Sequence, residues 1–327
     1  MKKILITGAN GFIGRCLVEG ALERGYEVWA GVRKKSMTSS FADERIRFID
    51  LDYEDVTALA AQLSEAGRFD YIIHNAGLTK TLKTADFYRV NADYTKNLTN
   101  ALTVSGMCPD KFLLMSSLSV YGPIHEKDGL PVSVSDAKMP DTHYGKSKLL
   151  AERHLQNQNL FPYIIFNVTG VYGPGDRDYI MQIESIRSGF DFQAGMKSQK
   201  LTFIYVKDLV DASFVALENM DVRNMSFIVS GEKVYTADDF SLIVKELLLL
   251  KRVIRIRLPL WLCYISCVAS WIVGRIRRKP PTLNPDKFKI IRQRNWSCDI
   301  KPLSEILGFT PSFDLKKGLF ETIFSTK

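Results

Sequence analysis

Three side chains in the middle of the chain have the types and spacing that proton transfer at an alcohol oxygen requires. Tyr144 and Lys148 lie four residues apart in YGKSK, so both project from one face of a predicted helix. A tyrosine with an unperturbed pKa of about 10 is a poor base at neutral pH, but a neighbouring ammonium group stabilises its phenolate and lowers that pKa. Ser117 ends an apolar strand, and its hydroxyl can hold a substrate oxygen while Tyr144 passes its proton. The trio predicts catalysis at a hydroxyl or carbonyl group.

A glycine-rich turn near the start of the chain predicts a dinucleotide site. In residues 2–14, KKILITGANGFIG, an apolar strand is followed by the turn and then by a helix. Gly8 permits the tight turn, Gly11 lets the backbone approach a pyrophosphate, and Gly14 lets helix and strand pack closely. The free N–H groups at the helix start then bind the phosphates. The predicted cofactor contacts here are Gly8, Asn10, Gly11, Phe12, Ile13 and Gly14.

The end of the second predicted strand, residues 27–32, indicates which dinucleotide is bound. An acid at this point holds the ribose hydroxyls of NAD, whereas a 2′-phosphate requires cations. Here Arg33, Lys34 and Lys35 follow the strand, and no acid occurs between Val28 and Ser40. We predict NADP, with Arg33 and Lys34 at its phosphate and with NAD as the alternative. A basic turn that faces only solvent is the simpler interpretation of the same residues.

Two further strand ends should face the same cofactor. Asp50 and Leu51 follow a strand over residues 47–49, although the neighbouring Asp52 is also a suitable helix cap. A strand over residues 71–74 leads into three small residues at the carboxyl edge, where cofactors bind. We expect cofactor contacts at Asp50, Leu51, Asn75, Ala76 and Gly77, together with Tyr144 and Lys148.

Strands that alternate with amphipathic helices at this spacing predict an α/β fold, a doubly wound parallel sheet of the Rossmann type. We assign residues 1–170 and 201–231 to this NADP-binding domain. Residues 171–200 and 232–327 are predicted to form a smaller, discontinuous substrate-binding lobe. A loop rich in proline, glycine, aspartate and serine, residues 123–141, is expected to be a mobile surface segment.

Charge and cysteine content exclude several functions. The 327 residues carry a formal net charge of +8, yet residues 251–294 alone hold twelve Lys or Arg and one acid. The remainder is slightly acidic, with 32 bases against 35 acids, which argues against nucleic-acid binding by the main domain. Five cysteines without metal-like spacing predict no metal site and a reducing cytoplasm. We also expect no secretory leader in MKKILITGANG.

The stretch LPLWLCYISCVASWIV, residues 258–273, is unusually apolar and has arginines on both sides. At about 16 residues it is shorter than the roughly 20 that span a bilayer. It is either a helix that closes the substrate pocket or a helix that lies on a membrane surface. In the second case residues 255–278 make a peripheral membrane contact at the inner face of a membrane. Both interpretations favour a large apolar substrate near Trp261 and Tyr264.

Several motifs together resemble the extended short-chain dehydrogenases/reductases, in the epimerase/dehydratase group. They are TGANGFIG, IIHNAG, SSLSVYG, YGKSK, VYGPGD and FIYVKDLV, in the family's order over about two-thirds of the chain. The resemblance implies a catalytic role for Ser117, Tyr144 and Lys148, with Asn91 as the helix residue that supports the site. It also points to a homodimer through a helix pair. The later segments KPPTLNPDK, WSCD and LGFTP are similar to the 3β-hydroxysteroid dehydrogenase-like branch.

Departures from the family pattern narrow the expected reaction. Members that act on sugar nucleotides often carry Arg-Pro and an Asn ahead of VYGP, where this chain has Asn167, Val168 and Gly170. Sugar dehydratases carry an Asp-Glu pair where this chain has Ser117 and Leu118. The resemblance therefore implies an NAD(P)-dependent oxidoreductase that interconverts a secondary alcohol and a ketone on an apolar small molecule. A nucleotide-sugar epimerase or reductase and a non-catalytic NADP-sensing protein are the alternatives. Expected substrate contacts are Thr79, Ser119, Tyr172, Trp261 and Tyr264.

Overall fold

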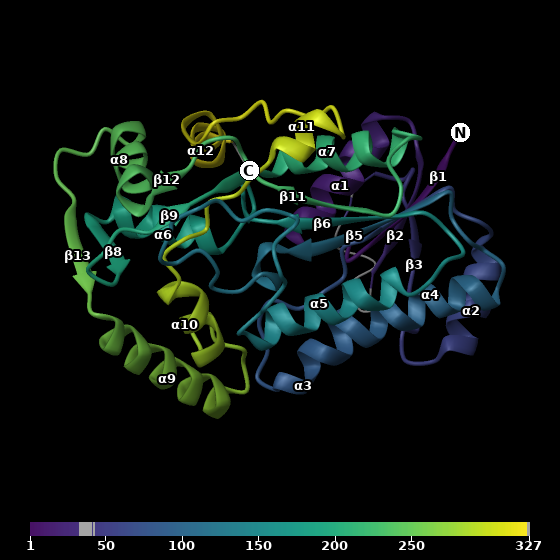
Figure 1. Cartoon of the computed structure of the whole chain (residues 1–327), viewed down its shortest axis with the longest axis horizontal. Coiled ribbons are helices and arrows are strands. Elements are labelled where there is room, and N and C mark those ends of the chain that lie inside the picture. Colours follow the sequence, from purple (N-terminus) through teal and green to yellow (C-terminus); the bar gives the residue numbers. More distant parts are fainter. Residues whose placement is uncertain (33–40, 42, 326–327) are drawn as a thin grey trace.

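The computed structural model of the chain describes residues 1–32, 41 and 43–325 and shows an α/β architecture (Figure 1). Arg33 and Lys34, the expected ligands of a 2′-phosphate, lie outside the described residues, and their role stays a prediction.

The main sheet has seven parallel strands in the order β11-β6-β5-β4-β1-β2-β3. Every residue of β4 and β5 is buried, because helices cover both faces of a parallel sheet and leave no polar side. The predicted doubly wound sheet is therefore confirmed. Its strands are β1 (Lys3–Thr7), β2 (Glu27–Gly31), β3 (Arg47–Ile49), β4 (Tyr71–His74), β5 (Lys111–Ser117), β6 (Tyr163–Val168) and β11 (Met225–Val229).

Two sets of helices enclose this sheet (Figure 1). On one face α1 (Phe12–Glu23) and α7 (Val206–Glu218) pack into one apolar cluster with the strands. On the other face α2 (Val56–Ala66), α4 (Tyr94–Val104) and α5 (His143–Gln156) contribute to a second cluster. The carboxyl ends of β1, β4 and β5 therefore meet at one edge, with helices on either side.

The helix that carries Asn91, the residue expected to support the site, is interrupted. It consists of α3 (Thr84–Phe87), a π-helical segment η2 (Tyr88–Asp93) and α4. Short π-helical segments are rare and often occur at functional sites, because the extra residue turns a side chain out of the regular helical register. Here η2 contains the buried Asn91.

The smaller lobe is built mainly from residues 170–205 and 231–294 (Figure 1). Three two-stranded pairs form it, β7–β10, β9–β12 and β8–β13. Their bounds are β7 (Gly170–Tyr172), β8 (Phe190–Ala194), β9 (Lys200–Leu201), β10 (Phe203–Tyr205), β12 (Tyr235–Thr236) and β13 (Ile254–Leu258). The helices are α6 (Asp178–Arg187), α8 (Ala237–Leu247), α9 (Leu260–Arg277) and α10 (Pro285–Arg292), and α12 (Leu315–Phe324) packs against α8.

The end of the chain differs from the predicted domain boundary. After α10 the chain returns to the main sheet, where α11 (Lys301–Glu305) contacts β11. Leu303, Leu307 and Phe309 pack in the same apolar cluster as α1 and α7. Residues 232–327 therefore do not all belong to the smaller lobe, because these apolar side chains are buried against the larger one.

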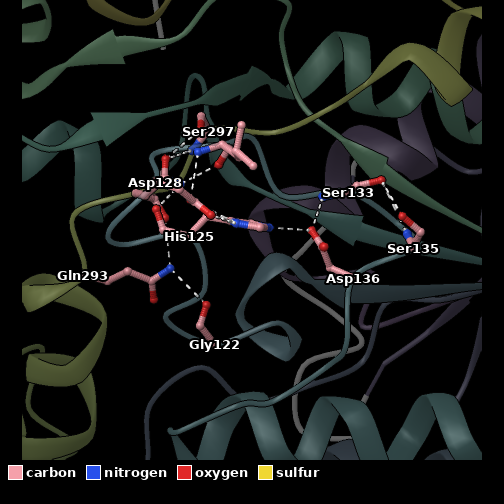
Figure 2. A network of polar contacts seen from close by, with 10 residues as sticks. Gly122, His125, Asp128, Ser133, Ser135, Asp136, Gln293 and Ser297 are labelled. Carbon is pink, nitrogen blue, oxygen red and sulfur yellow. Dashed lines mark hydrogen bonds and ion pairs between the residues drawn. The ribbon is translucent and has the colours of Figure 1, made fainter.

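Polar contacts tie the loop between β5 and α5 to the segment after α10 (Figure 2). Gln293 donates from Nε2 to the carbonyl of Gly122, and Asn295 donates to the carbonyls of His125 and Leu130. Within the loop the His125 ring lies between two carboxylates, with Nδ1 3.0 Å from Asp128 Oδ2 and Nε2 3.3 Å from Asp136 Oδ2. The segment expected to be mobile is therefore bonded to a part of the chain about 170 residues away.

The pair of carboxylates makes the loop's contribution to stability depend on pH. Asp128 and Asp136 raise the pKa of His125 above its ordinary 6.5, so the imidazolium stabilises the fold below that pH and the effect is lost as pH rises through the raised pKa. His125 lowers the pKa of Asp128 in turn, so the effect is also lost below about pH 4, as pH falls through that lowered pKa. We expect His125→Gln to lower the urea midpoint more at about pH 5.5 than at about pH 8.

His154 gives the matched control, because burial lowers its pKa instead. Folding keeps such a histidine neutral, so its presence lowers the stability of the fold as pH falls. His154→Gln should therefore lower the urea midpoint less at about pH 5.5 than at about pH 8. Equal losses for His125→Gln at both pH values would contradict the ion-pair assignment.

Candidate active site

The glycine loop between β1 and α1 has the close packing that its spacing predicts. Gly8 has φ of +65°, and a Cβ there would lie 2.8 Å from the backbone of Ala76. A Cβ at Gly14 would collide with the Gly8 carbonyl. Gly11 occupies the N-cap of α1 with extended backbone, and neither a side-chain cap nor an acid occupies the first turn. The first N–H groups of α1 thus have no side-chain cap, and the loop beside them lines the cavity, an arrangement that fits a dinucleotide phosphate.

The segment after β4 lies between the glycine loop and the helix α5. Asn75 donates from Nδ2 to the Gly8 carbonyl at 3.4 Å, and Ala76 N donates to Thr7 Oγ1 at 3.1 Å. A Cβ added to Gly77 would lie 3.1 Å from Lys148 Nζ. This small-residue turn therefore brings the predicted phosphate site next to the predicted catalytic lysine.

The three predicted catalytic side chains converge at the carboxyl end of β5. Ser117 is the last residue of β5, and Tyr144 and Lys148 lie one turn apart on α5. The Ser117 hydroxyl lowers the pKa of the Tyr144 phenol, against the effect of burial, and accepts a hydrogen bond from Ser119 N at 3.2 Å. Lys148 donates from Nζ to the carbonyl of Met115 at 2.7 Å. The structure thus brings together a hydroxyl, a phenol and an ammonium group, as the sequence predicts.

The expected lowering of the tyrosine pKa does not hold in the protein alone. Burial raises the pKa of Tyr144, and the Ser117 hydroxyl opposes part of that rise. Burial also lowers the pKa of Lys148 to about 8, which the neighbouring Glu152 carboxylate opposes. For the pKa of Tyr144, the effect of desolvation exceeds that of the Lys148 ammonium, because the ammonium is directed to the Met115 carbonyl. At neutral pH Tyr144 is therefore a proton donor beside a mostly charged lysine.

Asn91 supports the site without lining the cavity. Its Oδ1 accepts from Leu78 N at 2.7 Å, and its Nδ2 donates to Ser147 Oγ at 2.9 Å. Ser147 Oγ donates to the Tyr144 carbonyl at 2.7 Å. The π-helical turn therefore lets one amide join the cofactor-side loop to the catalytic helix.

A buried carboxylate behind the site was missed by the sequence reasoning. Glu152 is fully buried on α5, one turn after Lys148. It accepts hydrogen bonds from the Ser116 hydroxyl, from Asn167 Nδ2 and from Lys138 Nζ at 2.6 Å. Its four-residue spacing from Lys148 was the available signal. It fixes α5 against β5 and β6, and its charge favours the protonated lysine.

Asp286 was also missed, although it lies in the quoted motif KPPTLNPDK. From the first turn of α10 it accepts from His143 N at 2.9 Å and from Tyr144 N at 3.2 Å. A carboxylate at a helix N-terminus is stabilising, because it satisfies free N–H groups and complements the helix dipole. The smaller lobe therefore helps to hold the start of the catalytic helix.

One large cavity, of about 1860 Å³, joins these parts. At one end its wall includes the glycine loop, Thr79 and Ser119, beside the catalytic trio. At the other end it is lined by Phe190, Phe192, Phe240, Leu258, Cys263 and Cys267. The site thus continues into an apolar region between α9, β8 and α8.

Three predicted substrate contacts are not in the cavity wall. Trp261 and Tyr264 are 65 % and 47 % exposed, because Cys263 and Cys267 occupy the inward face of α9. Tyr172 is buried among aromatic side chains and donates its hydroxyl to the Asp314 carbonyl. Asp50 and Leu51 follow β3, as predicted, but they too lie outside the cavity lining.

Comparisons with known proteins show which family the chain belongs to. The model of the NAD dependent epimerase/dehydratase family matches residues 4–229. A UDP-glucose 4-epimerase of Vibrio cholerae is 27% identical, over 98% of this chain and 94% of its own length. A decarboxylating sterol-4-alpha-carboxylate 3-dehydrogenase of Candida albicans is 22% identical, over 99% and 97%. A 2-alkyl-3-oxoalkanoate reductase of Stenotrophomonas maltophilia is 24% identical, over 97% of each chain.

Solved structures share the fold. A UDP-glucose 4-epimerase of Thermotoga maritima with UDP-glucose superimposes with a TM-score of 0.77 at 21% identity, covering 98% of this chain and 97% of that one. The match to the family model covers more than half of the chain, including the glycine loop, Ser117, Tyr144 and Lys148. The chain belongs to the NAD dependent epimerase/dehydratase family.

Proposed function

We propose that this protein is an NADP-dependent oxidoreductase that interconverts a secondary alcohol and a ketone on an apolar substrate. The observation that carries the proposal is the cavity that places Ser117, Tyr144 and Lys148 at one end and apolar side chains at the other. A substrate bound along it has its oxygen near Ser117 and its apolar body under α9. The sterol-carboxylate dehydrogenase and oxoalkanoate reductase relatives, whose names state carboxylates with apolar bodies, support the same class.

The residues divide the reaction between them. A bound nicotinamide cofactor supplies the hydride to the carbonyl carbon in reduction and accepts it in oxidation. Ser117 holds the carbonyl oxygen, and Tyr144 donates its proton to that oxygen as the alcohol forms. Lys148 stabilises the phenolate that remains, because its ammonium lies on the same helical face one turn away. In the reverse direction the phenolate takes the proton back.

The second candidate is a nucleotide-sugar epimerase, favoured by the relative from Vibrio cholerae. Residues near the cavity argue against it. Asn167 is buried and bonded to Glu152, so its amide does not reach a nucleotide phosphate. In the smaller lobe Arg255 pairs with Asp191 and Asp238, and Arg257 also pairs with Asp238. Both guanidinium groups are therefore engaged by carboxylates and not by a nucleotide phosphate. Saturable turnover of UDP-sugars, without net oxidation of cofactor, would favour the epimerase.

The role of Tyr144 is tested by removing its hydroxyl. Tyr144→Phe should lower kcat for ketone reduction by about a hundredfold to ten-thousandfold, the usual contribution of a positioned acid. Cofactor affinity, measured by fluorescence titration, should change little. Tyr88→Phe is the matched control, because it removes a hydroxyl that contacts His143 at the start of the same helix. Full turnover in Tyr144→Phe would overturn the assignment.

The lysine predicts a pH profile. Because burial lowers the pKa of Lys148 from 10.5 to about 8, its charge is lost as pH rises through that value. We expect kcat/KM for ketone reduction, which reports groups of the free enzyme, to fall above about pH 8. Lys148→Arg should be slower but should lose that decline, because guanidinium stays charged. A wild-type profile that is flat to about pH 10 would contradict this role.

Cofactor choice is tested by titrating the protein with NADPH and with NADH. We expect tighter NADPH binding, weakened about tenfold to a hundredfold by Arg33→Ala, the cost of one charge-assisted hydrogen bond. Arg45→Ala is the control, because this nearby exposed arginine pairs with Asp43 instead. Equal binding of both cofactors would discard NADP and revive the epimerase.

A further inference from the structure

The helix α9 presents its apolar side chains to the outside of the molecule. Among the described residues it is the one helix long and apolar enough to cross a membrane, yet only 17% of its 18-residue window is buried. Its buried positions are the small residues Cys263, Cys267 and Gly274. Its exposed positions carry large apolar groups, namely Trp261, Tyr264, Ile265, Ile272, Val273 and Ile276. A helix of a water-soluble surface shows the opposite pattern.

The neighbouring strands continue this apolar surface. Phe190 and Phe192 of β8 are exposed, as is Ile254 of β13, which pairs with β8 and leads into α9. In Figure 1 these elements and α9 form one outer margin of the smaller lobe, away from the main sheet. Apolar side chains exposed on elements that share one margin indicate an interaction site.

The charges around α9 are of one sign. Arg275, Arg277, Arg278 and Lys279 follow its apolar part and are exposed, and no ion pair to them occurs within the described part of the chain. The one acid between Lys251 and Arg294 is Asp286, which is turned inward onto the start of α5. An apolar face with an uncompensated basic end is complementary to anionic lipid headgroups.

The geometry favours a helix that lies in the interface over one that spans the bilayer. With 18 residues it is about 27 Å long, less than the roughly 30 Å of the hydrocarbon core. Both ends are also attached to the folded lobe, through β13 before it and through α10 after it. Gly274 packs against Pro281, and Tyr264 packs edge-on to Phe288 of α10. The chain therefore reaches α9 from the smaller lobe and returns to the same lobe after it.

We propose that the outer face of α9, with Phe190 and Phe192 beside it, docks on an anionic lipid surface. The inner face of the same helix lines the cavity through Cys263, Ser266 and Cys267. An apolar substrate dissolved in the bilayer then reaches the cavity past one helix, without crossing water. This second step rests on the proposed function, whereas the docking itself does not.

Docking is tested by flotation of the full chain with vesicles of phosphatidylcholine alone and of phosphatidylcholine mixed with phosphatidylglycerol. We expect binding to the mixed vesicles only, weakened by salt. Replacing Arg275, Arg277 and Lys279 together by Gln should lower the partition coefficient about a hundredfold or more. Ile265→Asp combined with Ile272→Asp should abolish flotation, since both side chains are exposed and the fold does not need them.

Val104→Asp is the matched control, because it places the same charge on an exposed apolar position of α4. It should float like the wild type. Vesicles with brominated acyl chains should quench tryptophan fluorescence, and Trp261→Phe should remove most of that quenching. No flotation, or flotation that the α9 substitutions leave unchanged, would overturn the proposal. A dimer in light scattering that Ile265→Asp dissociates would also overturn it, because a second copy would then cover this face.

A kinetic comparison separates docking from catalysis. A long-chain ketone is presented in the mixed vesicles, and a short water-soluble ketone is presented in buffer. The double aspartate variant should lose about tenfold or more of its turnover on the vesicle-borne ketone while retaining turnover of the short one. Equal effects on both would reject delivery from the bilayer. If neither ketone is turned over and flotation persists, the proposed function fails and the docking stands.

Discussion

The buried ammonium group of Lys148 is the constraint on which the arrangement of the site depends. A charge removed from water is costly unless polar groups replace the lost hydration. Here the Met115 carbonyl accepts a hydrogen bond at 2.7 Å, and the Glu152 carboxylate lies one helical turn away. Glu152 is itself fully buried and is satisfied only by groups from β5, β6 and the β5–α5 loop. The packing of α5 on the sheet is therefore also the means by which the lysine stays charged.

The smaller lobe completes this arrangement and does more than cover the cavity. Asp286 binds two backbone N–H groups at the start of α5, one of them that of Tyr144. Gln293 and Asn295 bind the loop that connects Ser117 to α5 (Figure 2). Both ends of the segment between Ser117 and Tyr144 are thus bonded to residues near α10. These hydrogen bonds therefore couple the position of the smaller lobe to the position of α5.

The sequence was informative where function depends on local geometry. Gly8, Gly11 and Gly14 sit in one turn, and Tyr144 and Lys148 sit on one helix, so spacing alone predicts their positions. For Glu152 the sequence offers only the four-residue spacing from Lys148, and for Asp286 it offers no such signal, because their other partners are brought near only by the folded chain. Asp286 binds residues 142 and 143 positions away. The π-helical turn at Asn91 was also missed, because an added residue in a helix leaves no clear trace in apolar periodicity.

The orientation of α9 also could not be predicted from the sequence. Large apolar residues occur around most of this helix, so periodicity does not say which side faces the cavity. The sequence predicts substrate contacts at the large residues Trp261 and Tyr264, yet the packed face of α9 consists of Cys263, Cys267 and Gly274. Small residues let neighbouring backbone approach α9 closely, as the segment between α9 and α10 does where Pro281 contacts Gly274. Close packing on that side forces the bulky side chains outward, where water is a poor solvent for them. The apolar outer face is thus the consequence of how the inner face packs.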